Sequence, residues 1–298
     1  MRLFDELGVV LFDAAMGTAL MAAGQPKGVG SEEMNNIAPE TVMNIHLENI
    51  RAGSDVVTSN TFGITQVMMR GDRDGALETL RKAVSLTKTA AAAGEAPCVR
   101  KIHTCLCVGP SGALLGPFGD KSYEEAEELY AAQAEAGAQA GVDFVFLETF
   151  PDLEEFAHAA RVVKKASGLP VCGTMTFEKN GRSFMGASPE GLIDVARAEK
   201  LSATGANCTL DPAEILPVIE KLISLADGLP IIAQPNAGKP VYSDGAIVYQ
   251  TSAEAFVRDA VKLLDAGVSG IGGCCGTNPS IISAIRDIID RRQKAHDK

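Results

Sequence analysis

Short apolar runs alternate with longer amphipathic segments along the whole chain. The apolar runs have the length and the β-branched content of buried strands. They lie at 9–14, 55–60, 101–108, 143–148, 170–176, 203–208, 230–235 and 269–274. Each run precedes a stretch of helical periodicity, and these stretches cover 39–52, 73–93, 123–140, 153–167, 189–200, 212–226, 252–266 and 279–292.

Capping residues mark where several of these helices begin. Ser122 stands three residues before Glu125, and Asp152 stands three residues before Glu155. This is the spacing of a capping box, in which the two side chains and the two backbone amides bond reciprocally. We therefore expect helices to start directly after Ser122 and Asp152.

Eight strand-then-helix units predict an α/β fold, a (β/α)₈ TIM barrel that forms a single domain over residues 1–298. A doubly wound open sheet is the alternative. No glycine fingerprint for a dinucleotide follows the first strand, where Ala14-Ala15-Met16-Gly17 stands instead. The segment 15–38 is longer than a usual connection, and we expect it to cover the functional site.

Composition and charge narrow the class of protein. The chain has 298 residues, 46% of them apolar, and a formal net charge of −11. No basic stripe is present, which argues against binding to nucleic acid or to an anionic membrane. The N-terminal run carries acidic residues, unlike a signal peptide, and no uncharged apolar stretch reaches the roughly 18 residues of a membrane span. We expect a soluble, cytoplasmic protein of undetermined oligomeric state.

Three of the seven cysteines stand where strands end. Cys208 closes the sixth apolar run, and Cys274 and Cys275 close the eighth. In a barrel only strand seven lies between these two ends, so one metal ion could bind all three thiolates. Three protein ligands and one open position are typical of a catalytic zinc ion. A vicinal disulfide, an inert pair and a metal-free redox protein are the alternatives.

The vicinal pair also predicts the local backbone. Neighbouring side chains on a regular strand point to opposite faces, so Cys274 and Cys275 can bind one ion only where the backbone is irregular. Gly272, Gly273 and Gly276 permit such irregularity. The other four cysteines, Cys98, Cys105, Cys107 and Cys172, are predicted to be ordinary thiols.

Two acidic residues also end apolar runs. A buried carboxylate needs a partner, and no Lys or Arg stands at a strand end next to Asp13 or Glu148. The ammonium group of a substrate is therefore the predicted partner, and a structural pairing with backbone amides is the alternative. Asn60, Asn207 and Asn236 also follow strands, either as substrate contacts or as turn residues.

The predicted ligand set favours one kind of chemistry. Zinc lowers the pKa of a bound thiol so that the thiolate is present near neutral pH. An all-sulfur site suits the generation of hydroxide poorly, because water-activating zinc sites rely mainly on imidazole. The sequence thus favours alkylation of a thiol over hydrolysis.

Seven strings along the chain carry a family resemblance, and they span nearly its whole length. They are 12–18 (FDAAMGT), 58–62 (TSNTF), 109–112 (GPSG), 148–149 (ET), 207–208 (NC), 234–238 (QPNAG) and 272–277 (GGCCGT). With them the chain resembles the zinc-dependent homocysteine S-methyltransferase family, and within it the N-terminal homocysteine-binding module of cobalamin-dependent methionine synthase.

The resemblance implies particular roles for the candidate residues. It implies that Cys208, Cys274 and Cys275 bind zinc and that homocysteine sulfur takes the fourth position. It implies that Asp13 and Glu148 hold the amino-acid end, that Asn207 and Asn236 line the site, and that Asn236 takes the open zinc position when substrate is absent. Ala14-Ala15 departs from the glycines usual in the family, which affects any close backbone approach to homocysteine.

The methyl donor is the open question. No Asp-x-His-x-x-Gly motif of a corrinoid module occurs, and the chain has no Trp and four Tyr for an aromatic cage around betaine. The resemblance favours a methylcorrinoid, either free methylcobalamin or one carried by a partner corrinoid protein. S-methylmethionine- or betaine-dependent transfer and a non-catalytic subunit that binds homocysteine or zinc are the alternatives.

Overall fold

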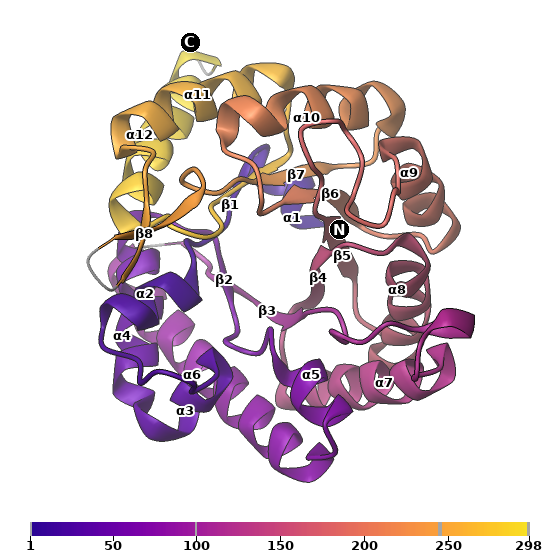
Figure 1. The fold of residues 1–298 in the computed structure, drawn as a ribbon. Coiled ribbons are helices and arrows are strands. Elements are labelled where there is room, and N and C mark those ends of the chain that lie inside the picture. Colours follow the sequence, from indigo (N-terminus) through magenta and orange to yellow (C-terminus); the bar gives the residue numbers. More distant parts are fainter. Residues whose placement is uncertain (1, 99, 244–245, 297–298) are drawn as a thin grey trace.

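The computed structural model describes residues 2–98, 100–243 and 246–296. Eight parallel strands form a nearly closed barrel with helices around it (Figure 1), which confirms the predicted fold. The strands follow one another in the order β1-β10-β7-β6-β5-β4-β3-β2. Their bounds are β1 (Val10–Leu11), β2 (Val56–Thr58), β3 (His103–Val108), β4 (Phe144–Phe150), β5 (Val171–Met175), β6 (Ala203–Asn207), β7 (Ile231–Gln234) and β10 (Gly270–Ile271).

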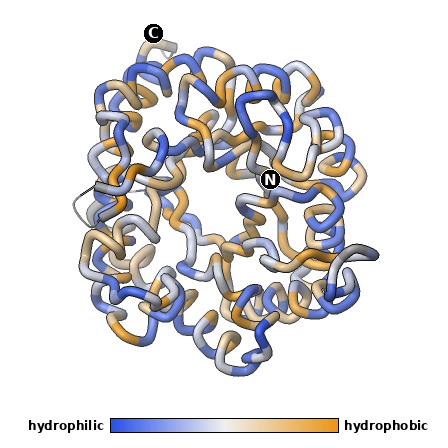
Figure 2. Tube along the Cα trace, viewed as in Figure 1, coloured by the Kyte–Doolittle hydropathy of each residue, from blue (hydrophilic) through white to orange (hydrophobic). Residues whose placement is uncertain are grey.

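The outer ring consists of the helices that the periodicity predicts. They are α4 (Pro39–Ala52), α6 (Arg73–Cys98), α7 (Tyr123–Ala140), α8 (Leu153–Ser167), α9 (Pro189–Ala198), α10 (Pro212–Ala226), α11 (Ala253–Ala266) and α12 (Pro279–His296). Hydrophilic and hydrophobic residues alternate along these outer helices (Figure 2), because each presents one face to the barrel and one to solvent. No helix in the described part of the chain is long and apolar enough to cross a membrane.

Several short elements were not predicted. Most lie in the connections after strands, where the hydrophobic pattern is too short to show a period. They are α1 (Arg2–Leu7), α2 (Met16–Ala22), η1 (Ser31–Glu33), α3 (Met34–Ile37), α5 (Ile64–Met69), η2 (Gly116–Phe118) and the antiparallel hairpin of β8 (Pro240–Ser243) and β9 (Ala246–Tyr249).

One of the two predicted capping boxes is present. The backbone amide of Glu125 donates to Ser122 Oγ over 3.1 Å, and that of Ser122 donates to Glu125 Oε2 over 2.8 Å. The prediction of a second capping box, between Asp152 and Glu155, is wrong. Asp152 does cap α8, but the carboxylate of Glu155 turns inward and accepts hydrogen bonds from the Ser111 amide and the Tyr130 hydroxyl. A tertiary partner has replaced the local one.

The interior of the barrel is apolar toward the N-terminal ends of the strands and polar toward their C-terminal ends. Alternate residues of each strand face inward. The lower layer is formed by Phe12, Val56, Cys105, Phe144, Phe146, Cys172, Ala203 and Ile232, and Leu3 and Phe4 of α1 close it from the N-terminal side. Further along several strands the inward residue is polar, for example Glu148 after Phe146 and Gln234 after Ile232. The site therefore rests on a packed apolar floor.

The barrel closes between β1 and β2 through aspartate side chains. The two strands share no paired ladder. At one end the Asp55 amide donates to Leu11 O over 2.7 Å, and Asp55 Oδ2 accepts from the Leu11 amide over 2.9 Å. At the other end Asp13 Oδ2 accepts from the Thr58 amide over 2.8 Å. Each carboxylate takes the place of a strand carbonyl.

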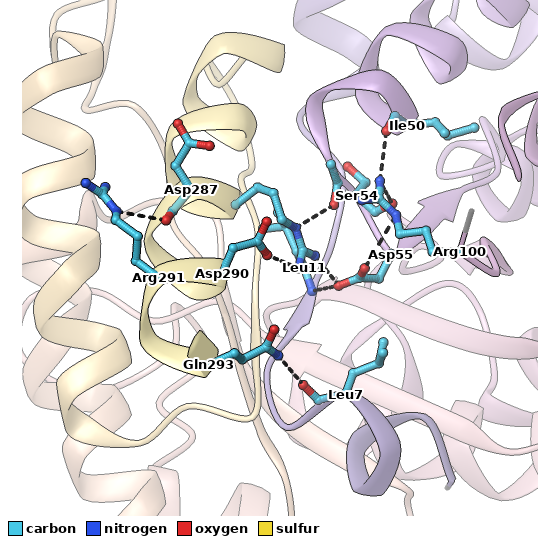
Figure 3. Close-up of polar contacts among 12 residues, drawn as sticks. Leu7, Leu11, Ile50, Ser54, Asp55, Arg100, Asp287, Asp290, Arg291 and Gln293 are labelled. Carbon is cyan, nitrogen blue, oxygen red and sulfur yellow. Dashed lines mark hydrogen bonds and ion pairs between the residues drawn. The ribbon is translucent and has the colours of Figure 1, made fainter. Parts of the chain in front are cut away.

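Two guanidinium groups hold Asp55 in this position. Arg286 from α12 binds Asp55 Oδ2, and Arg100 lies 3.8 Å from Asp55 Oδ1 (Figure 3). The same arginines donate to the carbonyl groups of Gly53, Ser54 and Ile50. The last helix is thereby fastened across the point where the barrel closes.

Replacement of Asp55 is expected to destabilise the whole barrel. Asp55→Asn leaves two partly buried guanidinium groups without their carboxylate, which should lower the free energy of unfolding by about 3 kcal/mol. Asp290→Asn is the matched control, because Asp290 contacts the same Arg286 from an exposed position and should cost at most about 0.5 kcal/mol. Urea unfolding measures both. Equal losses in the two variants would contradict the closing role of Asp55.

Candidate metal centre and substrate cavity

A cavity of about 390 Å³ opens at the carboxyl ends of the strands. Its wall includes six of the predicted site residues, namely Asp13, Asn60, Glu148, Cys208, Cys274 and Cys275. Met16, Met21, Ser31 and Glu32 of the segment 15–38 also line it, so this segment does cover the site. No Lys, Arg or His contributes to the described wall. The cavity is therefore rich in acidic and thiol groups and lacks a cation.

The three cysteine sulfurs converge at the cavity wall. They lie within 4.8 Å of one another, and the Cys274 and Cys275 sulfurs are 4.0 Å apart. Cys274 and Cys275 lie beyond the end of β10 and Cys208 beyond the end of β6, so none of them belongs to a regular strand. The predicted backbone irregularity is therefore present.

Backbone hydrogen bonds hold the two cysteine turns against β7. The Cys208 amide donates to Gln234 O over 3.0 Å, and the Cys274 amide donates to Pro235 O over 2.9 Å. Cys208 has φ 64° and Thr209 has φ 55°. Two successive non-glycine residues in the left-handed region are strained, and such strain tends to collect at functional sites.

The thiol cluster carries one negative charge readily and further charges with difficulty. Hydrogen bonds from Cys208 and Cys274 hold the pKa of Cys275 well below its usual range. The hydrogen bonds with Cys208 and Cys275, together with burial, raise the pKa of Cys274 well above the usual range. The three neighbouring sulfurs therefore differ in how tightly they hold a proton.

The donor set fits a zinc ion. Four thiolates at the usual Zn–S length of about 2.3 Å on a tetrahedron are about 3.8 Å apart, close to the 4.0 Å between the Cys274 and Cys275 sulfurs. A divalent cation would also offset the repulsion among thiolates that lie this close together. Cys208, Cys274 and Cys275 are the residues that would hold it.

Asp13 pairs with a backbone amide and a hydroxyl group, and the pairing with an amide is the alternative that the sequence left open. Its two carboxylate oxygens accept from the Thr58 amide and from Thr58 Oγ1, both over 2.8 Å. Burial nevertheless raises the pKa of Asp13 to about 7, because the loss of hydration outweighs these two bonds. Asp13 both closes the barrel and lines the cavity.

Glu148 faces the cavity from β4 beside a thiol. Cys107 donates to Glu148 Oε2 over 3.0 Å. Burial raises the pKa of Glu148 to about 7, and the nearby Asp13 carboxylate contributes to the rise. Among the described residues no cation pairs with this carboxylate. Its ionised form therefore lacks a positively charged partner in the described part of the chain.

The three asparagines lie in different settings. Asn60 Nδ2 donates to Ser31 O over 2.6 Å and so fastens the covering segment to β2. Asn207 does not line the cavity; its amide bonds with the Thr149 amide, Thr149 Oγ1 and Thr174 Oγ1, which fixes the end of β4. Asn236 is buried next to the cavity, and its Oδ1 has no hydrogen-bond partner in the described part of the chain.

Sequence reasoning missed Cys107, Tyr249 and Glu32, which all line the cavity. Strand alternation could have found Cys107, because it follows the inward-facing Cys105 by two residues. Nothing local marks Tyr249 or Glu32, which lie on the hairpin and in the covering segment. Cys105 and Cys172 are buried thiols away from the cavity, as predicted, and the side chain of Cys98 lies outside the described residues.

Known proteins resemble this chain over most of its length. The profile of the family described as homocysteine S-methyltransferase matches residues 10–289. Methionine synthase from Mycobacterium tuberculosis is 28% identical over 292 residues, which cover 93% of this chain and 24% of that protein. Homocysteine S-methyltransferase 2 from Arabidopsis thaliana is 27% identical, with 86% of this chain and 85% of that protein covered.

The barrel also resembles a solved structure. The metallated form of the homocysteine methyltransferase MmuM from Escherichia coli superposes with a TM-score of 0.79 at 21% identity, covering 96% of this chain and 98% of that one. At 21% identity, this similarity supports the fold alone. The chain spans about a quarter of the length of the methionine synthases that it matches.

The buried Glu148 carboxyl should make the metal-free protein less stable as pH rises. Its folded pKa of about 7 exceeds the 4.5 that is ordinary for a glutamate carboxyl group. The folded state then binds the proton more tightly, so stability is full below about pH 4.5 and falls as the pH rises through 7. Glu148→Gln should therefore raise the free energy of unfolding at pH 8 by roughly 1–3 kcal/mol and leave it unchanged at pH 4.5.

Urea unfolding at both pH values measures this difference. The exposed Glu128→Gln is the control, which should show no such dependence on pH. A Glu148→Gln variant that is less stable than the wild type at pH 8 would contradict the unpaired state of this carboxylate.

Proposed function

We propose, on the premise that this chain belongs to the homocysteine S-methyltransferase family, that it transfers a methyl group to the thiol of homocysteine at a zinc centre. Cys208, Cys274 and Cys275 would hold the zinc ion. The convergence of these three sulfurs on the wall of one acidic cavity is the observation that carries the proposal.

The cavity has groups for both ends of the amino acid that would be methylated. Homocysteine carries an ammonium group. Asp13 is a buried carboxylate and Glu148 a partly buried one, and no cationic side chain lines the described wall beside them. An ammonium group beside them would favour their ionised forms and offset the cost of their burial. The cysteine cluster lies on the same wall, so the substrate thiol can approach it while the ammonium group stays with the carboxylates.

Each part of the chain then has a defined task. When bound, zinc supplies the acidity that keeps the thiol of the substrate as a thiolate at neutral pH. Asp13 and Glu148 orient the substrate, Asn60 keeps the covering segment in place, and Met16 and Met21 limit the access of water. A sulfur–carbon bond forms to the methyl group as the donor–methyl bond breaks, and the donor keeps the electron pair.

The surface around the cavity supports a large methyl donor. All the large apolar side chains that are exposed in the described part of the chain lie in connections that follow strands, on the cavity side of the barrel. They are Met21, Ile37, Phe62, Leu114, Phe184, Met185, Tyr242, Ile247 and Val248. An apolar surface concentrated on one face is typical of a protein contact. It favours a methylcorrinoid delivered by a partner protein over a small donor.

A cationic donor is the second candidate. Glu32 lines the cavity as a third carboxylate and makes no ion pair with the described residues. A sulfonium group, as in S-methylmethionine, or the quaternary ammonium group of betaine would be attracted to it. A homocysteine- or zinc-binding subunit without turnover is the remaining alternative, since the chain spans only part of the methionine synthases.

The assignment of the three cysteines as metal ligands predicts a loss of zinc when one of them is replaced. Cys208→Ala should remove a ligand and reduce the zinc content of protein purified with zinc to a small fraction of one ion per chain. Cys172→Ala is the matched control, because it removes a buried thiol below the cavity and should keep full occupancy. Metal analysis by mass spectrometry gives both values. Full zinc occupancy in Cys208→Ala would refute the assignment.

The donor is tested by mixing zinc-loaded protein and homocysteine with one donor at a time. Methionine should form with methylcobalamin or a methylated corrinoid protein. In a separate binding measurement, Glu148→Gln should bind homocysteine about 5- to 150-fold more weakly and keep its zinc, as expected for the loss of a charge-assisted hydrogen bond. Methionine formed only from S-methylmethionine or betaine would reject the corrinoid. Homocysteine binding without methionine from any donor would indicate a binding subunit.

A further inference from the structure

The hairpin of β8 and β9 is tied to the metal centre through the backbone. It follows β7 and pairs Pro240 with Tyr249 and Tyr242 with Ile247. At its base the Thr251 amide donates to Ala237 O over 3.1 Å, and the Ala237 amide donates to Cys275 O over 2.9 Å. The candidate metal ligand Cys275 is thus joined by a backbone hydrogen bond to Ala237, at the base of the hairpin.

Tyr249 makes a second link from the hairpin to the same ligand. It lines the cavity together with Cys275, and burial and the nearby Cys275 sulfur together raise the pKa of Tyr249. The aromatic ring lies directly over Gly276, where an added Cβ would stand 2.2 Å from Tyr249 Cγ. Gly276 also has φ 83°, in the left-handed region. The turn after Cys275 therefore has room for this ring only because residue 276 is glycine.

We propose that Tyr249 is a positioning residue of the metal centre, which donates a hydrogen bond from its hydroxyl to the sulfur of Cys275. The inference rests on the proposed function, because it assumes that the three cysteines hold zinc. It assigns to the hairpin an effect on the metal through Cys275, beside the hydrogen bond that Asn207 of β6 donates to Cys274 Sγ over 4.0 Å.

The effect follows from the charge of the site. Three thiolates on a divalent ion leave a net charge of −1, buried beside the carboxylates of Asp13 and Glu148. Such a charge needs hydrogen-bond donors, and no Lys, Arg or His is present in the described wall to provide them. A phenol is protonated near neutral pH and can donate. Groups that donate to metal ligands orient them, and removal of such a group typically costs 10- to 100-fold in metal affinity or activity.

The same hairpin offers a matched control. Tyr242 lies on β8 with 73% of its surface exposed, and it does not line the cavity. Tyr249→Phe and Tyr242→Phe each remove a single hydroxyl and keep the ring. Any effect on the fold of the hairpin should be similar in the two variants, whereas an effect on the metal should occur in Tyr249→Phe alone.

Zinc affinity is measured by competition with a chromophoric chelator, and the ligand field is measured by absorption of the Co²⁺-substituted protein. Tyr249→Phe should bind zinc about 10- to 100-fold more weakly and should shift the thiolate-to-cobalt charge-transfer bands. Tyr242→Phe should match the wild type in both. A purely structural role for Tyr249 would leave the cobalt spectrum unchanged.

The outcomes separate the two proposals. Unchanged affinity and an unchanged spectrum in Tyr249→Phe, with normal zinc binding by the wild type and loss of zinc in Cys208→Ala, would overturn the role of Tyr249 alone. A wild-type protein that binds no zinc would overturn the proposed function. Circular dichroism and the unfolding midpoint of each variant ensure that folded proteins are compared.

Discussion

The closure of the barrel between β1 and β2 is the constraint on which the rest of the structure depends. These two strands are joined by the carboxylates of Asp13 and Asp55 instead of a full ladder. Asp55 is fixed by Arg286 from α12, the last helix, and by Arg100, which precedes β3, so α12 supports the closure of the barrel. Asp13 closes the other end of the same gap and lines the cavity. The residue that completes the barrel is thus also one that we expect to contact substrate.

The cavity collects negative charge that the protein does not neutralise. Two carboxyl groups with raised pKa values and three neighbouring thiols share one wall, and no cationic side chain joins them in the described part of the chain. Such a site is unfavourable for an empty protein, because burial penalises each charge. It becomes favourable when a divalent cation meets the sulfurs and an ammonium group meets the carboxylates. At Glu148, the same negative charge that would bind an ammonium group therefore lowers the stability of the empty protein.

Strained and glycine-dependent turns surround this cavity. Thr149, Cys208 and Thr209 adopt left-handed backbone conformations. The side-chain amide of Asn207 bonds with Thr149 and Thr174, and its Nδ2 also donates to Cys274 Sγ over 4.0 Å. The cysteine turn after β10 accepts the ring of Tyr249 because Gly276 has no side chain. These features keep the thiols on irregular backbone, where three sulfurs from two strand ends can point to one place. The rigid floor of Phe12, Phe146 and Ile232 beneath them limits their movement.

The sequence by itself determined the repeated strand and helix units, most helix starts and the three cysteines at two strand ends, because hydrophobic period and capping are local properties of the chain. Only the tertiary structure decided the partners of the polar residues. Glu155 accepts hydrogen bonds from Ser111 and Tyr130 instead of completing the predicted capping box. Asp13 accepts from Thr58, and Cys107 donates to Glu148. Tyr249 lies beside Cys275. Most of these partners lie more than 25 residues apart in the chain. Their contacts depend on how strands register and how connections fold back, and no local pattern of residues encodes either.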